Sequence, residues 1–158
     1  MFRAIVVGTD GSDGASKAVL AAAELAASQP ESVLHIVTVQ KPLSPTAIAA
    51  SEMAAAAPAA AERGWEDEIK AELEQTLGRA ADAAGRAGET RIETHARFGS
   101  PAEVLCDMAA HLQADLIVVG NRGMRGGRRF LGSVPNSVSH HAPCSVLIVD
   151  TTHIPVDE

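Results

Sequence analysis

The segment 116–134 consists of Leu116-Ile117-Val118-Val119-Gly120-Asn121-Arg122-Gly123, then eight residues, then Gly132-Ser133-Val134. The apolar run before Gly120 predicts a buried strand, and serine is a residue type that begins helices. A strand that passes through glycines into a helix start lines a concave loop with backbone N–H groups, which suits phosphate oxygens. The leading hypothesis is therefore a nucleotide pocket, against the alternative that these glycines mark a plain tight turn.

A second strand of the same type lies at the start of the chain. Ala4-Ile5-Val6-Val7 runs into Gly8-Thr9-Asp10-Gly11-Ser12, after which a helical pattern begins. In an open parallel sheet, ligands bind outside the carboxyl ends of the strands, where the strand order reverses. We therefore expect the loops after these two strands to face each other across one crevice.

Strands and helices alternate along the chain. The remaining strands are predicted at 33–39, at 91–96 as an edge strand, and at 145–149. Helices are predicted after Ser12, from Trp65 and from Ser133, and Ser100-Pro101-Ala102-Glu103 predicts a capping box with proline at the first helical position. This order predicts an α/β fold with a single doubly wound five-stranded parallel sheet and helices on both faces.

The stretch between the second predicted strand and Trp65 is the weakest part of this pattern. From Pro45 to Gly64 it is rich in alanine, contains Pro58, and lacks large apolar residues that could anchor a helix. We expect a mobile loop or a frayed turn there. Beyond it, a four-residue repeat predicts a helix that lies on the sheet, with Trp65, Ile69, Leu73, Leu77 and Ala81 on its apolar stripe.

Length and composition limit the range of functions. A chain of 158 residues fits one domain, so residues 1–158 are expected to form a single nucleotide-binding domain. A net charge of −7 argues against nucleic acid or an anionic membrane as a partner. The chain has no membrane-span pattern and no secretory signal, and we expect a cytoplasmic location. Cys106 and Cys144 are predicted free thiols, and the histidines form no metal-ligand pattern.

Several separated motifs resemble the universal stress protein family, and the resemblance covers residues 3 to 149. The matching segments are 7–12, 99–103, 114–120, 132–134 and 142–149. The resemblance implies strand order 3-2-1-4-5, a homodimer joined along the last strand and, in one branch, bound ATP. That branch carries Gly, two residues, Gly, nine residues, Gly, and then Ser or Thr.

This chain departs from the branch pattern in two places. Eight residues instead of nine separate Gly123 from Gly132, and Gly126-Gly127 could absorb the difference through positive φ. Pro135 occupies a position that often carries a hydroxyl in the family, and proline offers neither a hydroxyl nor an N–H to a phosphate.

The resemblance also implies which residues bind the nucleotide. Asp10 would contact the ribose or a metal-bridged phosphate, although it could instead cap the next helix. Thr9 and Val39 would flank the adenine. Phosphates would be received by N–H groups of the loop and the following helix, and by the Ser133 hydroxyl. The complete implied set is Thr9, Asp10, Val39, Gly120, Asn121, Arg122, Gly123, Gly132, Ser133 and Val134. The arginines Arg125, Arg128 and Arg129 would offset phosphate charge or form a solvated loop.

We therefore expect a stress-response regulator that binds an adenine nucleotide and forms a homodimer through strand 145–149. ATP with Mg²⁺, ADP, AMP and a cyclic nucleotide all stay open as ligands. A slow ATPase or adenylate-transferring enzyme is a second interpretation, opposed because no Lys follows the glycines as in a P-loop and no carboxylate is placed to orient a water. A dimeric interaction module with a vestigial pocket is the third, opposed by the retained Gly120, Gly123, Gly132 and Ser133.

Overall fold

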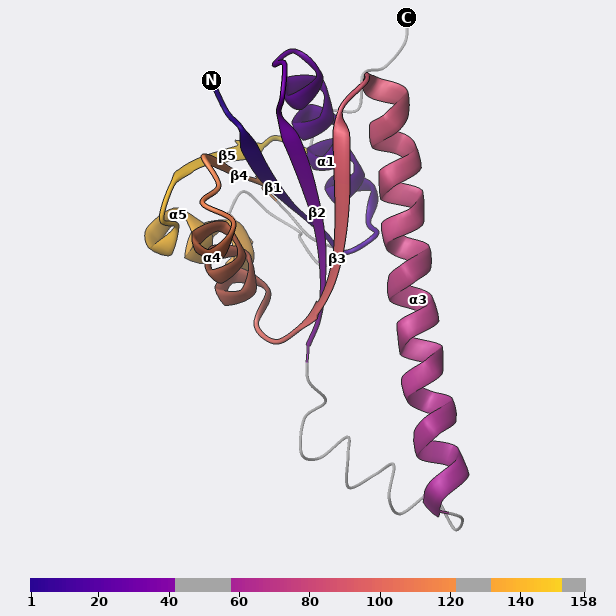
Figure 1. Cartoon of the computed structure of the whole chain (residues 1–158). Helices are drawn as coiled ribbons and strands as arrows, with labels where there is room; N and C mark the ends of the chain where they lie inside the picture. Colours follow the sequence, from indigo (N-terminus) through magenta and orange to yellow (C-terminus); the bar gives the residue numbers. More distant parts are fainter. Residues whose placement is uncertain (42–57, 122–131, 152–158) are drawn as a thin grey trace, which may run out of the picture.

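The computed structural model describes residues 1–41, 58–121 and 132–151, with the backbone alone over residues 58–66. The strands are β1 (Ala4–Thr9), β2 (Val33–Gln40), β3 (Arg91–Phe98), β4 (Leu116–Gly120) and β5 (Ser145–Val149). They form one parallel sheet in the order β3-β2-β1-β4-β5 (Figure 1). The predicted fold class and strand order are confirmed, with β3 at one edge and β5 at the other.

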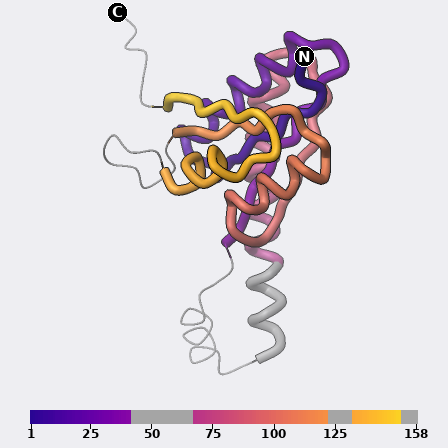
Figure 2. Tube along the Cα trace, turned by 90° about the vertical axis from the view of Figure 1, so that its left-hand side faces the viewer, coloured from indigo at the N-terminus to yellow at the C-terminus, as the bar shows by residue number. Residues whose placement is uncertain are grey.

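Helices cover both faces of this sheet. They are α1 (Asp13–Ala27), α3 (Pro58–Ala87), α4 (Pro101–His111) and α5 (Ser133–His141). Figure 1 shows α1 and α3 on one side of the sheet and α4 and α5 on the other, and the tube view in Figure 2 looks onto the side that carries α4 and α5. Among the described residues, no helix has the length and apolar character needed to cross a membrane.

The two faces of the sheet carry separate cores. The core under α1 and α3 contains Ile5, Val7, Leu34, Ile36, Leu77 and four alanines of α1, Ala18, Ala22, Ala23 and Ala26. The core under α4 and α5 contains Val6, Val37, Leu105, Ile117 and Val138. Because β1, β2 and β4 are covered on both faces, they are apolar almost throughout, as central strands of parallel sheets usually are.

Helix α3 begins earlier than the sequence suggested. It starts at Pro58, so the expectation of a loop is wrong over residues 58–64, while residues 42–57 lie outside the described part of the chain. Alanine has the highest helix propensity of any residue, and proline is tolerated in the first turn. Leu73 and Leu77 are buried as the four-residue repeat predicted.

The two predicted helix caps have different outcomes. Ser12 is the N-cap of α1, where its Oγ accepts the N–H of Ala15 at 3.2 Å. Ser100 precedes α4, and Pro101 stands in the first turn as predicted, but the Ser100 side chain makes no capping bond. The predicted capping box is therefore wrong, and the free N–H groups at the start of α4 are left for other acceptors.

Candidate functional site

The carboxyl ends of the central strands meet at one edge of the sheet. Thr9, the last residue of β1, pairs with Thr38 of β2. Val7 pairs with Val118 of β4, and Gly120 ends that strand two residues later. The strands that precede the two glycine-containing loops are neighbours as expected, because β4 pairs directly with β1.

The loop after β1 is held by its own side chains. The Thr9 hydroxyl accepts the N–H of Gly11 at 3.2 Å, and Oδ1 of Asp10 accepts the N–H of Ser12 at 3.0 Å. Gly11 has a φ of +77°, a conformation that glycine adopts without steric cost. Asp10 thus shapes the turn that leads into α1 while its side chain remains exposed at the strand ends.

Asn121 anchors the loop after β4. Its N–H donates to the carbonyl of Val149 at 2.9 Å, and its own carbonyl accepts the N–H of Gly132 at 3.0 Å. Its side chain bonds Asp150 and Thr151, which follow β5. The N–H of Asn121 is already used, so the expectation that it receives a phosphate does not fit this geometry. Asn121 instead connects the end of β4 to Gly132 and to the end of β5 through its backbone hydrogen bonds.

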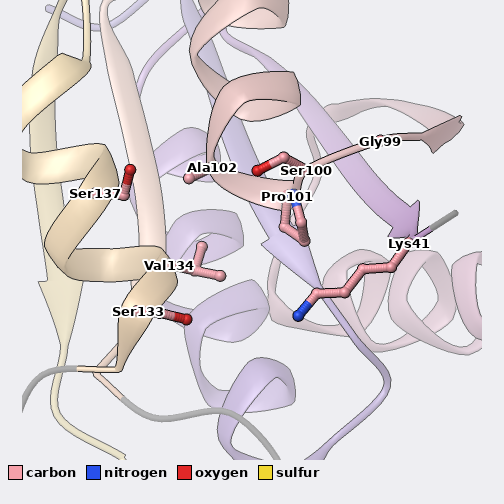
Figure 3. Close-up of a pocket in the computed structure, with 8 residues that line it drawn as sticks. All are labelled: Lys41, Gly99, Ser100, Pro101, Ala102, Ser133, Val134 and Ser137. Carbon is pink, nitrogen blue, oxygen red and sulfur yellow. The ribbon is translucent and has the colours of Figure 1, made fainter. Parts of the chain in front are cut away.

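A cavity of about 480 Å³ opens at this edge of the sheet, between α4 and α5 (Figure 3). Its volume lies within the range of roughly 300–1,000 Å³ that is common for small-molecule sites. Of the predicted site residues, the lining includes Ser133 and Val134. The complete lining is Lys41, Gly99, Ser100, Pro101, Ala102, Ser133, Val134 and Ser137.

The starts of two helices line the cavity. Ala102 lies in the first turn of α4, and Ser133 and Val134 lie in the first turn of α5. The first N–H groups of a helix have no acceptor within the helix, and neither helix start has a side-chain cap. Both helix dipoles therefore present their positive ends to this space, which favours an anion.

Lys41 adds a full positive charge to the cavity, and it was not predicted from the sequence. Figure 3 shows its side chain extending from the end of β2 toward Ser133 on the opposite wall. Its position two residues after the end of the strand predicted at 33–39, in a chain of net charge −7, was a usable signal. The other basic candidates, Arg122, Arg125, Arg128 and Arg129, lie outside the described residues, as does Gly123.

A second polar cluster lies away from this edge, on β2 and β3. Nδ1 of His35 is 3.1 Å from Nε2 of His95 and 3.5 Å from Oε2 of Glu93. Burial lowers the pKa of both imidazoles, and the carboxylate of Glu93 opposes this effect at each of them. The expectation that the histidines form no constellation is wrong. His35 and Glu93 are paired in register and Glu93 and His95 share a strand face, which the sequence could reveal only with the β2–β3 register.

The predicted free thiols are confirmed. Cys106 and Cys144 are unpaired and partly buried. Burial raises the pKa of both thiols, with nearby Asp107 and Asp115 adding to the effect at Cys106 and Cys144 respectively. Neither cysteine has the depressed pKa of a reactive thiolate.

Known proteins are similar to this chain in sequence and in fold. The universal stress protein Rv1636 of Mycobacterium tuberculosis is 36% identical over 152 residues, which cover 96% of this chain and 98% of that protein. A crystal structure of a universal stress protein in complex with cAMP is 34% identical, with a TM-score of 0.71 and coverage of 96% and 98%. The structure of the hypothetical protein MJ0577 has a TM-score of 0.77 over 98% and 99% of the chains, but at 19% identity it shows the fold alone.

The family model adds the same assignment over nearly the full length. The model of the universal stress protein family matches residues 1–150. This range includes every strand and helix of the sheet layers and both loops of the candidate site. The chain belongs to the universal stress protein family.

Proposed function

We propose that this chain, acting as one domain, binds an adenine nucleotide at the carboxyl edge of its sheet, with a phosphate between the starts of α4 and α5. The observation that carries this proposal is the cavity between the two helix starts, into which Lys41 extends. The polar groups around it are an amine, hydroxyls and backbone N–H groups, all of which donate hydrogen bonds. Such a lining suits an anion held locally in an otherwise acidic protein.

Several donors must act together for useful affinity. One helix start stabilises an anionic group by about 0.3–1 kcal/mol, and by up to about 2 kcal/mol when partly buried. A hydrogen bond to a charged group contributes about 1.5–3 kcal/mol. Two helix starts and the Lys41 amine together contribute about 2–7 kcal/mol. A micromolar site requires about 8 kcal/mol, so contacts of the base and ribose must add the rest.

The base and ribose would occupy the strand ends next to the cavity. Thr9 ends β1, Val39 is the penultimate residue of the neighbouring β2, and Asp10, which follows Thr9, is exposed. Gly120 and Gly132 border the anchored loop, and we include Arg122 and Gly123 of that loop in the proposed site. Asn121 would position the loop ends rather than donate to the ligand.

The nature of the nucleotide follows from how many phosphates the site must hold. The relative solved with cAMP, at 34% identity over 96% of this chain, supports a site for one phosphate. ATP with Mg²⁺ would require further donors, and we assign these to residues 122–131, which include Arg122, Arg125, Arg128 and Arg129. Occupancy would set the state of that loop and so the surface offered to a partner, which makes the protein a regulator of the stress response.

We also propose that the protein is a homodimer through β5. This strand ends the sheet, and its outer edge has no strand partner among the described residues. Leu147 on this strand is 38% exposed. Proteins normally cover or pair an apolar edge strand, because its free N–H and C=O groups invite association.

Thermal unfolding with and without nucleotide tests the binding site. Ligand at about a hundred times its dissociation constant stabilises the fold by roughly 2.7 kcal/mol, which raises the melting temperature by about 5–10 °C. We expect this rise with cAMP, AMP or Mg²⁺–ATP in nucleotide-free protein. Lys41→Gln should weaken binding about tenfold or more, because one charge-assisted hydrogen bond is lost, and Ser133→Ala should weaken it less.

Lys70→Gln is the matched control, since Lys70 is an exposed lysine of α3, which lies on the side of the sheet opposite α4 and α5. Gly132→Val tests the loop end: a Cβ there would meet Asn121 and Pro135 at 3.5 Å, an ordinary contact, so the fold should survive while nucleotide is excluded. A melting rise in Lys41→Gln equal to that of the parent protein would contradict the proposed phosphate position. No rise with any adenine nucleotide would favour the interaction module instead.

A further inference from the structure

His35, Glu93 and His95 lie together on the sheet face that carries α4 and α5. Their neighbours on the two strands, such as Leu34, Ile36 and Ile92, point into the opposite core, which places the three polar side chains on this face. His35 is 5% exposed, whereas Glu93 and His95 are half-buried near the open edge of β3. One side of the cluster is thus buried and the other is accessible to solvent.

The separations within this cluster match those of ligands around one metal ion. Zinc is held at about 2.0–2.2 Å by nitrogen and oxygen, so two ligands of a tetrahedral site lie about 3.3–3.5 Å apart. The His35–His95 and His35–Glu93 distances are 3.1 and 3.5 Å, and all three ligand atoms lie within 4.8 Å of one another. The three residues therefore need little movement to bind a common ion.

We propose that His35 Nδ1, His95 Nε2 and a Glu93 carboxylate oxygen bind one divalent transition-metal ion of the zinc type. Two imidazoles and one carboxylate suit zinc, cobalt or nickel better than magnesium or calcium, which take oxygen ligands. Three protein ligands leave the fourth position of a tetrahedral ion for water on the exposed side. In the metal-free chain, one imidazole nitrogen donates a hydrogen bond to the other.

Arg91 orients the carboxylate from the outside. Its guanidinium donates to Oε1 of Glu93 at 2.8 Å, while Oε2 is the oxygen that faces His35. Partners of this kind fix the direction of a metal ligand in many sites. The Arg91 side chain is 73% exposed, so solvent screens its charge and reduces its repulsion of a cation.

This ion would lie apart from the proposed nucleotide. His35 is four residues before Val39 on β2, or about 13 Å at about 3.3 Å per residue. An ion bound there would not bridge phosphates at the strand ends. It would instead link the edge strand β3 to the central strand β2, and so stabilise the edge of the sheet.

Zinc titration of nucleotide-free protein, after removal of metals with a chelator, tests the site by calorimetry. We expect one Zn²⁺ per chain, with affinity reduced at least about 10–100-fold in His95→Ala and in Glu93→Gln. Loss of an outer partner alone costs that much in other metal sites. Bound Co²⁺ should show the visible absorption of a low-symmetry tetrahedral ion, which hexaaqua Co²⁺ lacks.

The double variant His140→Ala/His141→Ala is the matched control, because these two adjacent imidazoles are exposed on α5 and could bind zinc adventitiously. It should keep the Zn²⁺ affinity and the Co²⁺ spectrum of the parent protein. Thermal melts of each metal-free variant establish that it folds. If His95→Ala does not fold, Glu93→Gln still tests the site, because glutamine is nearly isosteric with glutamate. Parent-like zinc binding in a folded Glu93→Gln variant, or binding lost only in the His140/His141 variant, would overturn the proposal.

Discussion

Gly11 and Gly78 differ in backbone conformation, because Gly11 lies in a turn with positive φ and Gly78 lies inside a helix. Gly11 has a φ of +77°, and a Cβ there would lie 3.3 Å from Cγ2 of Thr76. Gly78 lies inside α3, where a Cβ would meet nothing within 4 Å. We expect Gly11→Ala to lower the free energy of unfolding by about 1–2 kcal/mol, because left-handed backbone is strained for alanine. Gly78→Ala should raise it by up to about 1 kcal/mol, because alanine favours helix.

Urea unfolding measures both changes as shifts of the midpoint at constant slope. The two variants carry the same chemical substitution, so a common effect of the added methyl group cancels in the comparison. Equal shifts of the same sign would contradict the assignment of Gly11 to a turn that requires positive φ.

At the scale of single residues, the sequence predicted what depends on local chemistry. Ser12 caps α1 as expected, because an N-cap needs only its own helix start. Ser100 has the same local pattern but makes no such bond. The cluster of His35 with His95 spans two strands 60 residues apart, and no local pattern reports which residues the register brings together. The position of Lys41 after a strand end was visible in the sequence, but the residues that line the cavity opposite it come from α4 and α5 and are brought there only by the fold.

Asp115 joins the starts of two neighbouring strands, β1 and β4. Its Oδ2 accepts the N–H of Arg3 at 2.7 Å and the N–H of Ala4 at 3.1 Å. The N–H of Asp115 donates in turn to the carbonyl of Ala4 at 2.9 Å. We expect Asp115→Ala to destabilise the fold by about 1–3 kcal/mol, because two backbone donors lose a charged acceptor. Chemical denaturation of the purified protein gives this value directly.

Asp107→Ala provides the comparison for Asp115→Ala, since Asp107 is an exposed carboxylate in the middle of α4. A surface change of that type should stay within about 0.5 kcal/mol. If both variants lose the same stability, the link between the strand starts contributes nothing beyond the removal of a charge.

At the scale of elements, the sequence predicted best the strands that are covered by helices on both faces of the sheet. The strands around Val6, Val37 and Val118 were predicted because a short, continuous apolar run in an α/β chain is typical of a strand covered on both faces. The start of α3 was mispredicted because residues 58–64 carry alanines without a large apolar stripe. The high helix propensity of alanine is enough to extend the helix over these residues. A prediction based on apolar periodicity detects only the helix segments that pack on a core, so it missed this part.

At the scale of the whole molecule, the strand order places the candidate site. The chain moves outward from β1 in one direction through β2 and β3 and in the other through β4 and β5, so the loops after β1 and β4 diverge at the same edge. The starts of α4 and α5 line one cavity at that edge, on the face of the sheet that these two helices cover. The alternation of elements determined this arrangement, whereas the positions of donors within the cavity depended on side-chain directions that only the structure supplies.

The edge of β5 is where the proposed homodimer can be tested against a matched surface. Leu147 on β5 and Leu20 on α1 are both 38% exposed, so they differ in location rather than in exposure. We expect sedimentation velocity at micromolar concentration to give a dimer for the parent protein, at twice the chain mass of 16.3 kDa. Leu147→Lys should shift the population to monomer, because a charge at an edge strand opposes pairing.

Leu20→Lys should leave the dimer intact, since α1 takes no part in the proposed interface. Both variants should keep cooperative melts, because neither leucine belongs to the buried core. A monomeric parent protein would contradict the dimer outright and would require the apolar edge of β5 to be covered in another way. A dimer that Leu20→Lys dissociates and Leu147→Lys preserves would move the interface from the sheet edge to the α1 face.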